Sequence, residues 1–286
     1  MKQSRLAQRK LGIKPTKKTK KINFLKPVLI LSFVLIIFGV LFFIFSPKSW
    51  DGKSRFAVVS QNPNGDVVIE ILDPLSSLVT NLTIPASTEV EAARQLGTWK
   101  LGSITRLGID KNLGSEYLKN TVIKSFRFPI DASVDLSIID KIRIKLFLIT
   151  VGGNSQSNLN LKDTDYIKRV QLVDGSLGWR ITDSIPTNVA VFFNENFGNN
   201  INVSINNASG IKSEGSMTGK VLEVMGLNVA SIQNLDKENS DCKITSLNQP
   251  LASKIAKIFN CSVNLTSPAN NFDMEINLGT NFAQRF

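Results

Sequence analysis

The clearest pattern in the chain is one uninterrupted apolar run near its start. Residues 28–46 (VLILSFVLIIFGVLFFIFS) contain no charged side chain. A helix of this length spans roughly 28 Å, close to the hydrocarbon thickness of a bilayer. The run therefore predicts a transmembrane helix over residues 27–46. A cleaved signal peptide is the alternative, but the following SPKSWDG offers no small-x-small cleavage site.

After this segment, the apolar positions follow strand spacing and then helix spacing. The expected elements are two strands around a Pro-Asn-Gly turn in 55–73, a strand in 78–85, and helices in 116–126 (with Ser115 as its N-cap) and 138–151. Such a mixture favours a layered α/β domain over residues 55–198. Within it, 159–198 shows only short strand-like runs around Asp174 and Gly175, without a firm assignment.

From residue 200 the alternation of strands and helices becomes regular. The pattern predicts strands at 201–206, 227–233, 242–247, 261–266 and 274–279, and helices at 216–226 and 250–260. Residues 200–286 therefore form a second expected α/β domain. The predicted fold class is α/β, with an N-terminal transmembrane helix followed by two α/β extracytoplasmic domains.

The distribution of charge sets the expected orientation in the membrane. Residues 1–26 carry ten Lys or Arg and no acidic residue, which leaves 24 basic and 23 acidic residues in the rest of the chain. Positive flanks stay cytoplasmic, so we expect a basic cytoplasmic tail over 1–26 and an extracytoplasmic body from Pro47 onward, with Trp50 at the outer interface. The tail is expected to contact membrane lipid rather than nucleic acid, because no recognised nucleic-acid motif accompanies it.

The chain contains no histidine. This excludes Ser-His-Asp and Cys-His nucleophile pairs, histidine general bases and every histidine-containing zinc site. Catalysis, if there is any, is restricted to carboxylate, lysine or arginine chemistry.

Cys242 and Cys261 are the only cysteines, and both lie in the expected extracytoplasmic part. Each begins a predicted strand, with a predicted helix between them. If those strands are parallel neighbours, both thiols lie at the same edge of the sheet. We favour a disulfide between Cys242 and Cys261 over two free buried thiols, and we expect no metal at this pair.

The segment from residue 201 to 234 resembles the opening of the LytR C-terminal domain. In that family a strand ending in Asn-x-[ST]-Gly is followed by a helix, a Leu-x-x-x-Gly-[FL]-x-Val step and another strand. The matching positions here are Asn207, Ser209, Gly210, Leu222, Gly226 and Val229, and the ending MEINLGTNFA, with Gly279 and Phe282, is similar to the family's terminal strand. A generic small α/β domain remains the alternative.

Residues 66–90 resemble a degenerate LytR-CpsA-Psr domain, a module that transfers lipid-pyrophosphate-linked glycopolymers onto peptidoglycan. The positions that fit are Asp66, Pro74, Ile84, Pro85 and Thr88. Three positions depart from the family pattern: Asn64 and Ala86 stand where arginines are expected, and Ser87 where an aspartate is expected. Arginines neutralise the phosphates of such a substrate, so their loss removes part of the machinery the family uses.

These observations leave two functional hypotheses. The favoured one is a single-pass, membrane-anchored cell-envelope protein without catalytic residues or cofactor, which binds peptidoglycan, an anionic wall polymer or an envelope partner. The alternative is a divergent phosphotransferase that uses Mg²⁺, Asp66 as a metal ligand and a cation such as Lys100 or Arg106. Asp66 follows a turn glycine, so a solvated hairpin residue is the plainer interpretation of it. The sequence does not indicate an oligomeric state.

Overall fold

The computed structural model describes residues 31–35, 37–39, 49–152, 155–195, 197 and 201–286. The chain divides into residues Met1–Ser46 and a compact body, Pro47–Phe286. Residues 31–35 and 37–39 are helical, and most of the predicted transmembrane segment lies outside the described residues. Within the described part of the chain, no helix is both long and apolar enough to cross a membrane.

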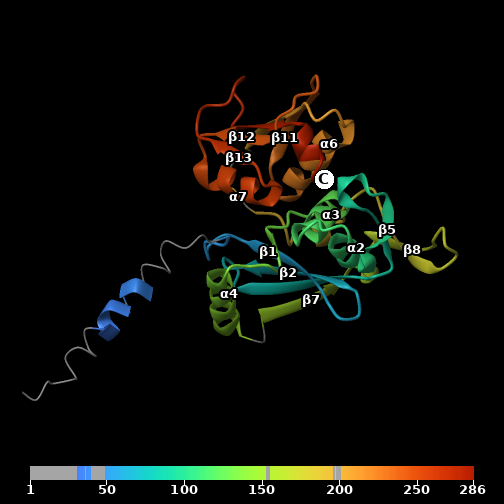
Figure 1. The fold of residues 1–286 in the computed structure, drawn as a ribbon, viewed down its shortest axis with the longest axis horizontal. Helices are drawn as coiled ribbons and strands as arrows, with labels where there is room; N and C mark the ends of the chain where they lie inside the picture. The colour runs from blue at the N-terminus through green and yellow to red at the C-terminus, as the bar shows by residue number, and fades with distance from the viewer. Residues whose placement is uncertain (1–30, 36, 40–48, 153–154, 196, 198–200) are drawn as a thin grey trace, which may run out of the picture. The chain divides into compact units, whose positions relative to one another are not determined.

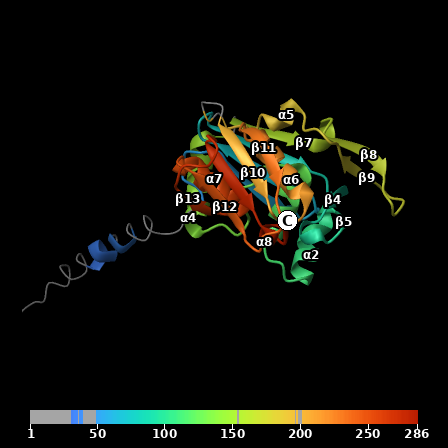
Figure 2. The same cartoon turned by 90° about the horizontal axis from the view of Figure 1, so that it is seen from above.

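The body is a mixed α/β structure with three sheets (Figures 1 and 2). Its elements in chain order are β1 (Phe56–Gln61), β2 (Val67–Asp73), β3 (Leu78–Ile84), β4 (Thr88–Glu91), η1 (Ala93–Gln95), β5 (Thr98–Lys100), η2 (Leu101–Ser103), α2 (Ile104–Asp110), α3 (Glu116–Phe126), β6 (Ala132–Ser133), α4 (Ile138–Val151), β7 (Gln156–Asn160), η4 (Leu161–Asp163), β8 (Ile167–Gln171), β9 (Leu177–Ile181), α5 (Thr187–Ala190), β10 (Asn202–Asn207), α6 (Lys212–Val224), β11 (Asn228–Asn234), β12 (Cys242–Ser246), α7 (Gln249–Phe259), β13 (Ser262–Asn264), β14 (Met274–Leu278) and α8 (Thr280–Ala283).

The first sheet, in the order β6-β1-β2-β3-β7, is covered on both faces. Successive residues of a strand point to opposite faces, and β1 shows this directly. Ala57 and Val59 enter the main core, whereas Phe56 and Val58 join a smaller cluster with Trp50 and α4. This sheet is therefore a buried middle layer, with α4 on one side of it.

A four-stranded sheet, in the order β5-β4-β9-β8, extends from the first. β8 and β9 form the antiparallel hairpin around the expected Asp174-Gly175 turn, with Gly175 at a φ of 80°. The C-terminal sheet has the order β11-β10-β14-β12-β13. It combines parallel pairs with one antiparallel pair, β12 and β14.

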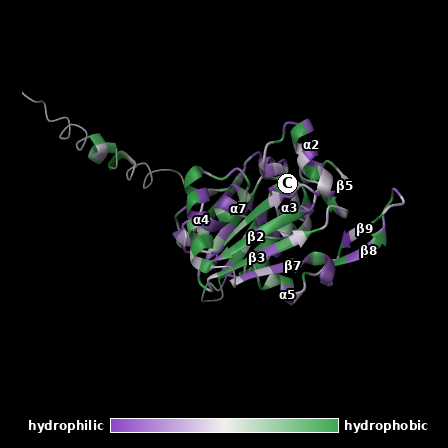
Figure 3. Ribbon diagram, turned by 90° about the horizontal axis from the view of Figure 1, so that it is seen from below, coloured by the Kyte–Doolittle hydropathy of each residue, from purple (hydrophilic) through white to green (hydrophobic). Residues whose placement is uncertain are grey.

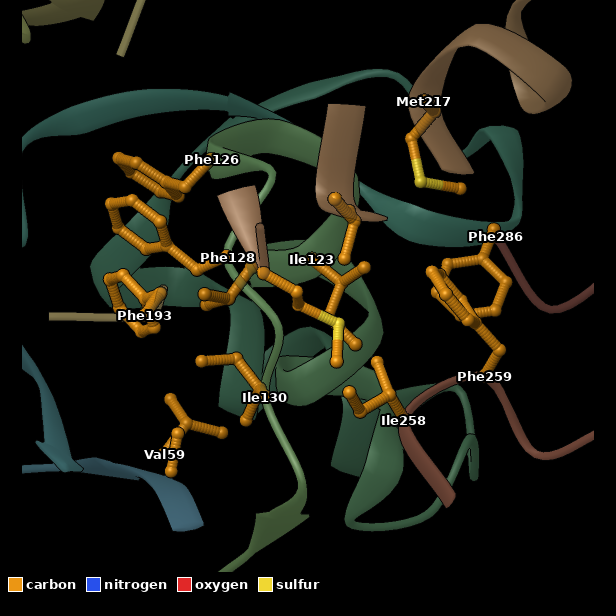
Figure 4. Close-up of a cluster of buried hydrophobic side chains, with 14 of the residues drawn as sticks. Val59, Ile123, Phe126, Phe128, Ile130, Phe193, Met217, Ile258, Phe259 and Phe286 are labelled. Atoms are coloured by element: carbon orange, nitrogen blue, oxygen red, sulfur yellow. The ribbon is translucent and has the colours of Figure 1, made fainter. Parts of the chain in front are cut away.

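One continuous apolar core joins the C-terminal elements to the first sheet. Figure 4 shows Val59 and Ile123 from the first part of the body in the same cluster as Met217, Ile258 and Phe286 from the last part. The aromatic rings are tightly packed within it: the Phe128 and Phe193 ring centroids lie 4.5 Å apart. Burial of these side chains supplies the main stabilisation of the body.

Most elements expected from the sequence are present, and two helices have the predicted bounds, α3 and α4. Ser115 occupies the N-cap position of α3, as predicted, but it has helical dihedral angles and its side chain makes no capping hydrogen bond. The helix expected at 216–226 begins earlier, at Lys212. Trp50 does not lie at an exposed interface: it is 1% exposed, because Phe56 and Phe147 pack against its ring.

Candidate functional site

Asp66 directly precedes β2 and forms hydrogen bonds with two turns. Its Oδ1 accepts a hydrogen bond of 2.8 Å from the backbone N–H of Ala86, which follows β3. Its own N–H donates to the Asn62 side chain across the β1–β2 turn. These bonds give Asp66 a structural role beyond that of a solvated turn residue. Its role as a metal ligand stays a prediction, and among the described residues no group of three acidic or cysteine side chains could hold a metal ion.

Ala86, at a position where the resembled family carries arginine, is closely packed by its neighbours. A Cβ added at Gly102 would approach the Ala86 Cβ to 2.8 Å, and one added at Gly65 would approach it to 3.3 Å. The Gly102 N–H also donates to the Ala86 carbonyl. The two glycines therefore allow the β1–β2 turn and η2 to close around a small side chain.

Lys100 and Arg106, the cations considered for the transferase hypothesis, both pair with carboxylates. Lys100 lies 2.7 Å from Asp174 in the β8–β9 turn and also donates to Ser176. Arg106 is 3.9 Å from Asp110 on the same helix, and its side chain is 87% exposed. In the described part of the chain, neither side chain forms a hydrogen bond or ion pair with Asp66.

A cavity of about 460 Å³ opens between β1, the segment from β6 to Asp135, α2 and α3. Its volume lies in the range of sites that bind small organic ligands. Its walls combine apolar side chains with hydroxyl, amide and one carboxyl group, as follows: Val59, Ser60, Gln61, Thr105, Gly108, Ile109, Asn112, Gly114, Ser115, Tyr117, Leu118, Ser133, Val134 and Asp135. None of these lining residues is Lys or Arg. The cavity therefore offers hydrogen bonds but no cation for a phosphate.

Close packing between α2 and α3 shapes the back of this cavity. A Cβ at Gly108 would meet the Tyr117 ring at 3.1 Å, so the glycine lets α2 lie against α3 without a shift of that ring. The Tyr117 hydroxyl and the Thr105 Oγ1 are buried without a hydrogen-bond partner among the described residues. Burial raises the pKa of Tyr117 despite the opposing charge of Arg94. The phenol thus stays neutral and retains an unused hydrogen-bonding capacity.

A second, more polar cavity of about 610 Å³ adjoins the first and shares Ser133 and Asp135 with it. Glu116 lines the second cavity: it accepts a 3.1 Å hydrogen bond from the Ser133 hydroxyl and forms a 2.8 Å ion pair with Lys119. The Lys119 ammonium group also donates to the carbonyl of Lys257 on α7. Lys119, which lines the second cavity, is thereby already held by a carboxylate and a carbonyl.

A buried ionic cluster joins β6 and its approach to α7. Lys254 lies 2.9 Å from Asp131 and 3.0 Å from Glu195. Burial by itself lowers the pKa of Lys254, but the two carboxylates outweigh it and hold that pKa above its ordinary value. Burial also raises the pKa of Glu195, against the attraction of Lys254. Asp131 further accepts from the Ala57 N–H, and the ion pairs of Lys254 make the cluster a joint between α7 and the approach to β6.

The predicted disulfide between Cys242 and Cys261 is confirmed, with Cα atoms 4.6 Å apart. β12 and β13, which precede and follow α7 in the chain, are parallel neighbours, so the condition on which the predicted pairing depended is met. The sequence pattern did not reveal the two cavities or the Lys254 cluster. Their residues come from segments far apart in the chain, and no local spacing connects them.

Comparisons with known proteins give little further information. No protein-family model matches the chain, and no curated protein matches it. The crystal structure of B. subtilis TagV, a LytR-CpsA-Psr family protein, is a weak structural neighbour, with 12% sequence identity and a TM-score of 0.24. The match covers 81% of this chain and 94% of TagV. A likeness this low carries no argument about function.

Proposed function

We propose that this chain is a single-pass, membrane-anchored cell-envelope protein that binds a segment of wall glycan without transforming it. The anchor is residues 27–46, and the basic residues of 1–26 hold the N-terminus in the cytoplasm. The body from Pro47 onward is then extracytoplasmic. Disulfides persist in oxidising compartments, so the bond between Cys242 and Cys261 agrees with this location.

One observation carries the proposed ligand: the lining of the 460 Å³ cavity. Sugar rings present hydroxyl groups at their edges and C–H groups on their faces. The exposed Asn112 and Asp135 side chains can bond the hydroxyl groups, while the exposed Ile109 and Val134 side chains supply apolar contact. The lack of Lys and Arg in the lining favours an uncharged peptidoglycan glycan over an anionic wall polymer.

Binding without transfer follows from the state of the charged groups. Pyrophosphate chemistry requires cations on the phosphates and carboxylates that hold a divalent metal. Here the Asp66 carboxylate is bonded to the Ala86 N–H, and Lys100 and Arg106 are paired with carboxylates. The chain therefore needs no cofactor in this role.

The test is a binding measurement with full-length protein in detergent micelles and soluble peptidoglycan glycan fragments. We expect saturable binding that weakens about tenfold, or about 1.4 kcal/mol, in Ile109→Trp, because Ile109 is exposed at the cavity and an indole there blocks it. Leu75→Trp, at an exposed turn outside the cavity, is the matched control and should bind as the parent does.

Two results would contradict the proposal. Equal binding by Ile109→Trp and the parent would place the ligand elsewhere. Phosphate release from an undecaprenyl-pyrophosphate-linked substrate with magnesium, abolished by Asp66→Ala, would instead establish the transferase hypothesis.

A further inference from the structure

Helix α4 is apolar on two opposite faces, and only one of them is covered. Ile144 and Phe147 pack with Trp50 and the first sheet. The opposite face carries four large apolar side chains that follow helical spacing and are 73, 44, 56 and 69% exposed: Ile138, Ile142, Leu146 and Ile149. Figure 3 shows hydrophobic colour on α4 at the end of the body opposite the β8–β9 hairpin. A water-facing helix normally has polar residues in these positions.

Two lysines accompany the exposed stripe. Lys141 and Lys145 lie along one flank of it and are both exposed. Neither forms an ion pair with another residue in the described part of the chain. The one acidic residue of the helix, Asp140, is fully buried and turned toward the body. The exposed face of α4 is therefore apolar and basic, a combination typical of helices that lie on anionic lipid surfaces.

The buried face of the same helix holds the start of the body. The Asp140 carboxylate accepts hydrogen bonds from the N–H groups of Ser49 (2.9 Å) and Trp50 (3.2 Å). The Arg143 guanidinium donates to the Trp50 carbonyl at 2.7 Å. These three bonds fix the point at which the chain enters the body directly against α4.

The length of the chain then limits how far α4 can lie from the bilayer. The predicted anchor ends at Ser46, three residues before Ser49. Three extended residues span at most about 10 Å. With residues 27–46 as the anchor, this chain length would keep the start of the body, and α4 with it, near the outer membrane surface.

We propose that the exposed face of α4 lies on the outer surface of the membrane, with its apolar stripe at the boundary of headgroups and acyl chains. Lys141 and Lys145 bind the phosphates of anionic lipids. This inference rests on the proposed membrane anchor and adds a second, peripheral contact that orients the body. A second copy of the chain is the less favoured partner for this face. A two-fold contact through it would bring the positively charged lysines of both copies together, and they would repel one another.

The test uses full-length protein reconstituted into vesicles of phosphatidylcholine and phosphatidylglycerol. Leu146→Cys introduces one labelling site for an environment-sensitive fluorophore, since both native cysteines are held in the disulfide. Val173→Cys is the matched control: Val173 is 95% exposed in the β8–β9 turn, away from α4 (Figure 1). Flotation of the vesicles reports whether the protein is anchored, and circular dichroism reports whether each variant is folded.

We expect blue-shifted emission from the label at position 146 and strong quenching by a nitroxide-labelled lipid, with neither effect at position 173. Replacing phosphatidylglycerol by phosphatidylcholine, or combining Lys141→Gln with Lys145→Gln, should reduce the quenching. Solvent-like emission at position 146 in protein that floats would overturn the α4 proposal and leave the anchor intact. A blue shift without lipid quenching would indicate a second copy and also overturn it. Failure to float would overturn the anchor and the α4 proposal together.

Discussion

Residues 55–198 and 200–286 both contain α/β layers, but they satisfy their polar groups differently. In the C-terminal sheet the polar face is internally bonded: the Asn206 side chain donates to both Glu275 and Asn277. The disulfide also closes the edge of that sheet. In the first part, Tyr117 and Thr105 leave buried hydroxyl groups without partners beside an open cavity, and α4 leaves an apolar face uncovered.

This difference suggests that the bonded groups of residues 200–286 mainly stabilise the fold, whereas the open groups of residues 55–198 are available to a ligand or a surface. A sheet whose polar side chains bond one another gains rigidity, whereas unpaired hydroxyl groups beside a cavity can bond a ligand. The C-terminal part also has unpaired buried atoms, Glu214 Oε2, Thr218 Oγ1 and Arg285 Nε, but none of these residues lines the 460 Å³ cavity. We therefore assign ligand and membrane contact to residues 55–198. The Lys254 cluster is one joint, beside the shared apolar core, between the C-terminal part and the first part.

The largest expected effect comes from breaking that joint. Lys254→Met leaves the Asp131 and Glu195 carboxylates buried without their cation, which should lower the free energy of unfolding by about 3–5 kcal/mol. Urea unfolding of the full-length protein in micelles measures this loss. Lys220→Met, at an exposed position of α6, is the control and should change little. Adding Glu195→Gln to Lys254→Met should restore part of the lost stability. A loss under about 1 kcal/mol in Lys254→Met alone would show that the cluster does not stabilise the contact between the two parts.

Removing the disulfide should have a smaller effect, confined to the C-terminal part. The bond closes a loop with a sequence separation of 19, for which the chain-entropy model gives about 3 kcal/mol. We expect Cys261→Ser to lower stability by that order and to leave a Cys242 thiol that reacts only on unfolding, since Cys242 is 2% exposed. Ready thiol titration of the native parent protein would disprove the bond. Glycan binding should persist in Cys261→Ser, because the cavity contains no residue of the C-terminal part.

The smallest expected effect is a gain in stability from a substitution at the contact between α6 and α3. Burial raises the pKa of Glu214, against the opposing charges of Lys124 and Arg127, and its Oε2 has no partner among the described residues. A raised folded-state pKa contributes stability below the ordinary value of 4.5 that is lost as pH rises through the folded-state pKa. Glu214→Gln cannot ionise, so it should be more stable than the parent near pH 7 by about 0.5–1 kcal/mol.

Unfolding curves collected at several pH values check this gain. The advantage of Glu214→Gln should shrink as the pH falls toward 4.5, where the parent glutamate becomes neutral. Glu223→Gln, exposed on the same helix, is the control and should not share that pH dependence. A Glu214→Gln variant less stable than the parent at pH 7 would mean that the carboxylate is needed in its charged form.

Local patterns were sufficient to place most elements of the body. Helical spacing alone located α3 and α4. The order strand, helix, strand around Cys242 and Cys261 favoured the disulfide on the condition that the two strands are parallel neighbours, and they are. These inferences succeed because periodicity and short crossovers depend on residues close together in the chain. Asp66 was also identified as a turn residue of interest, but its bond to Ala86 joins positions 20 residues apart and left no local signal.

Only the tertiary structure decided which side chains from distant segments become neighbours. The sequence shows that α4 is rich in apolar residues, but burial of Ile144 and exposure of Ile142 depend on which face meets Trp50. The cavity and the Lys254 cluster likewise require β1, β6 and the helices to converge from distant segments. The amino-acid sequence thus determined the kind and order of the elements. Long-range packing determined which side chains share a site, because burial and electrostatic coupling depend on distance in space rather than on separation along the chain.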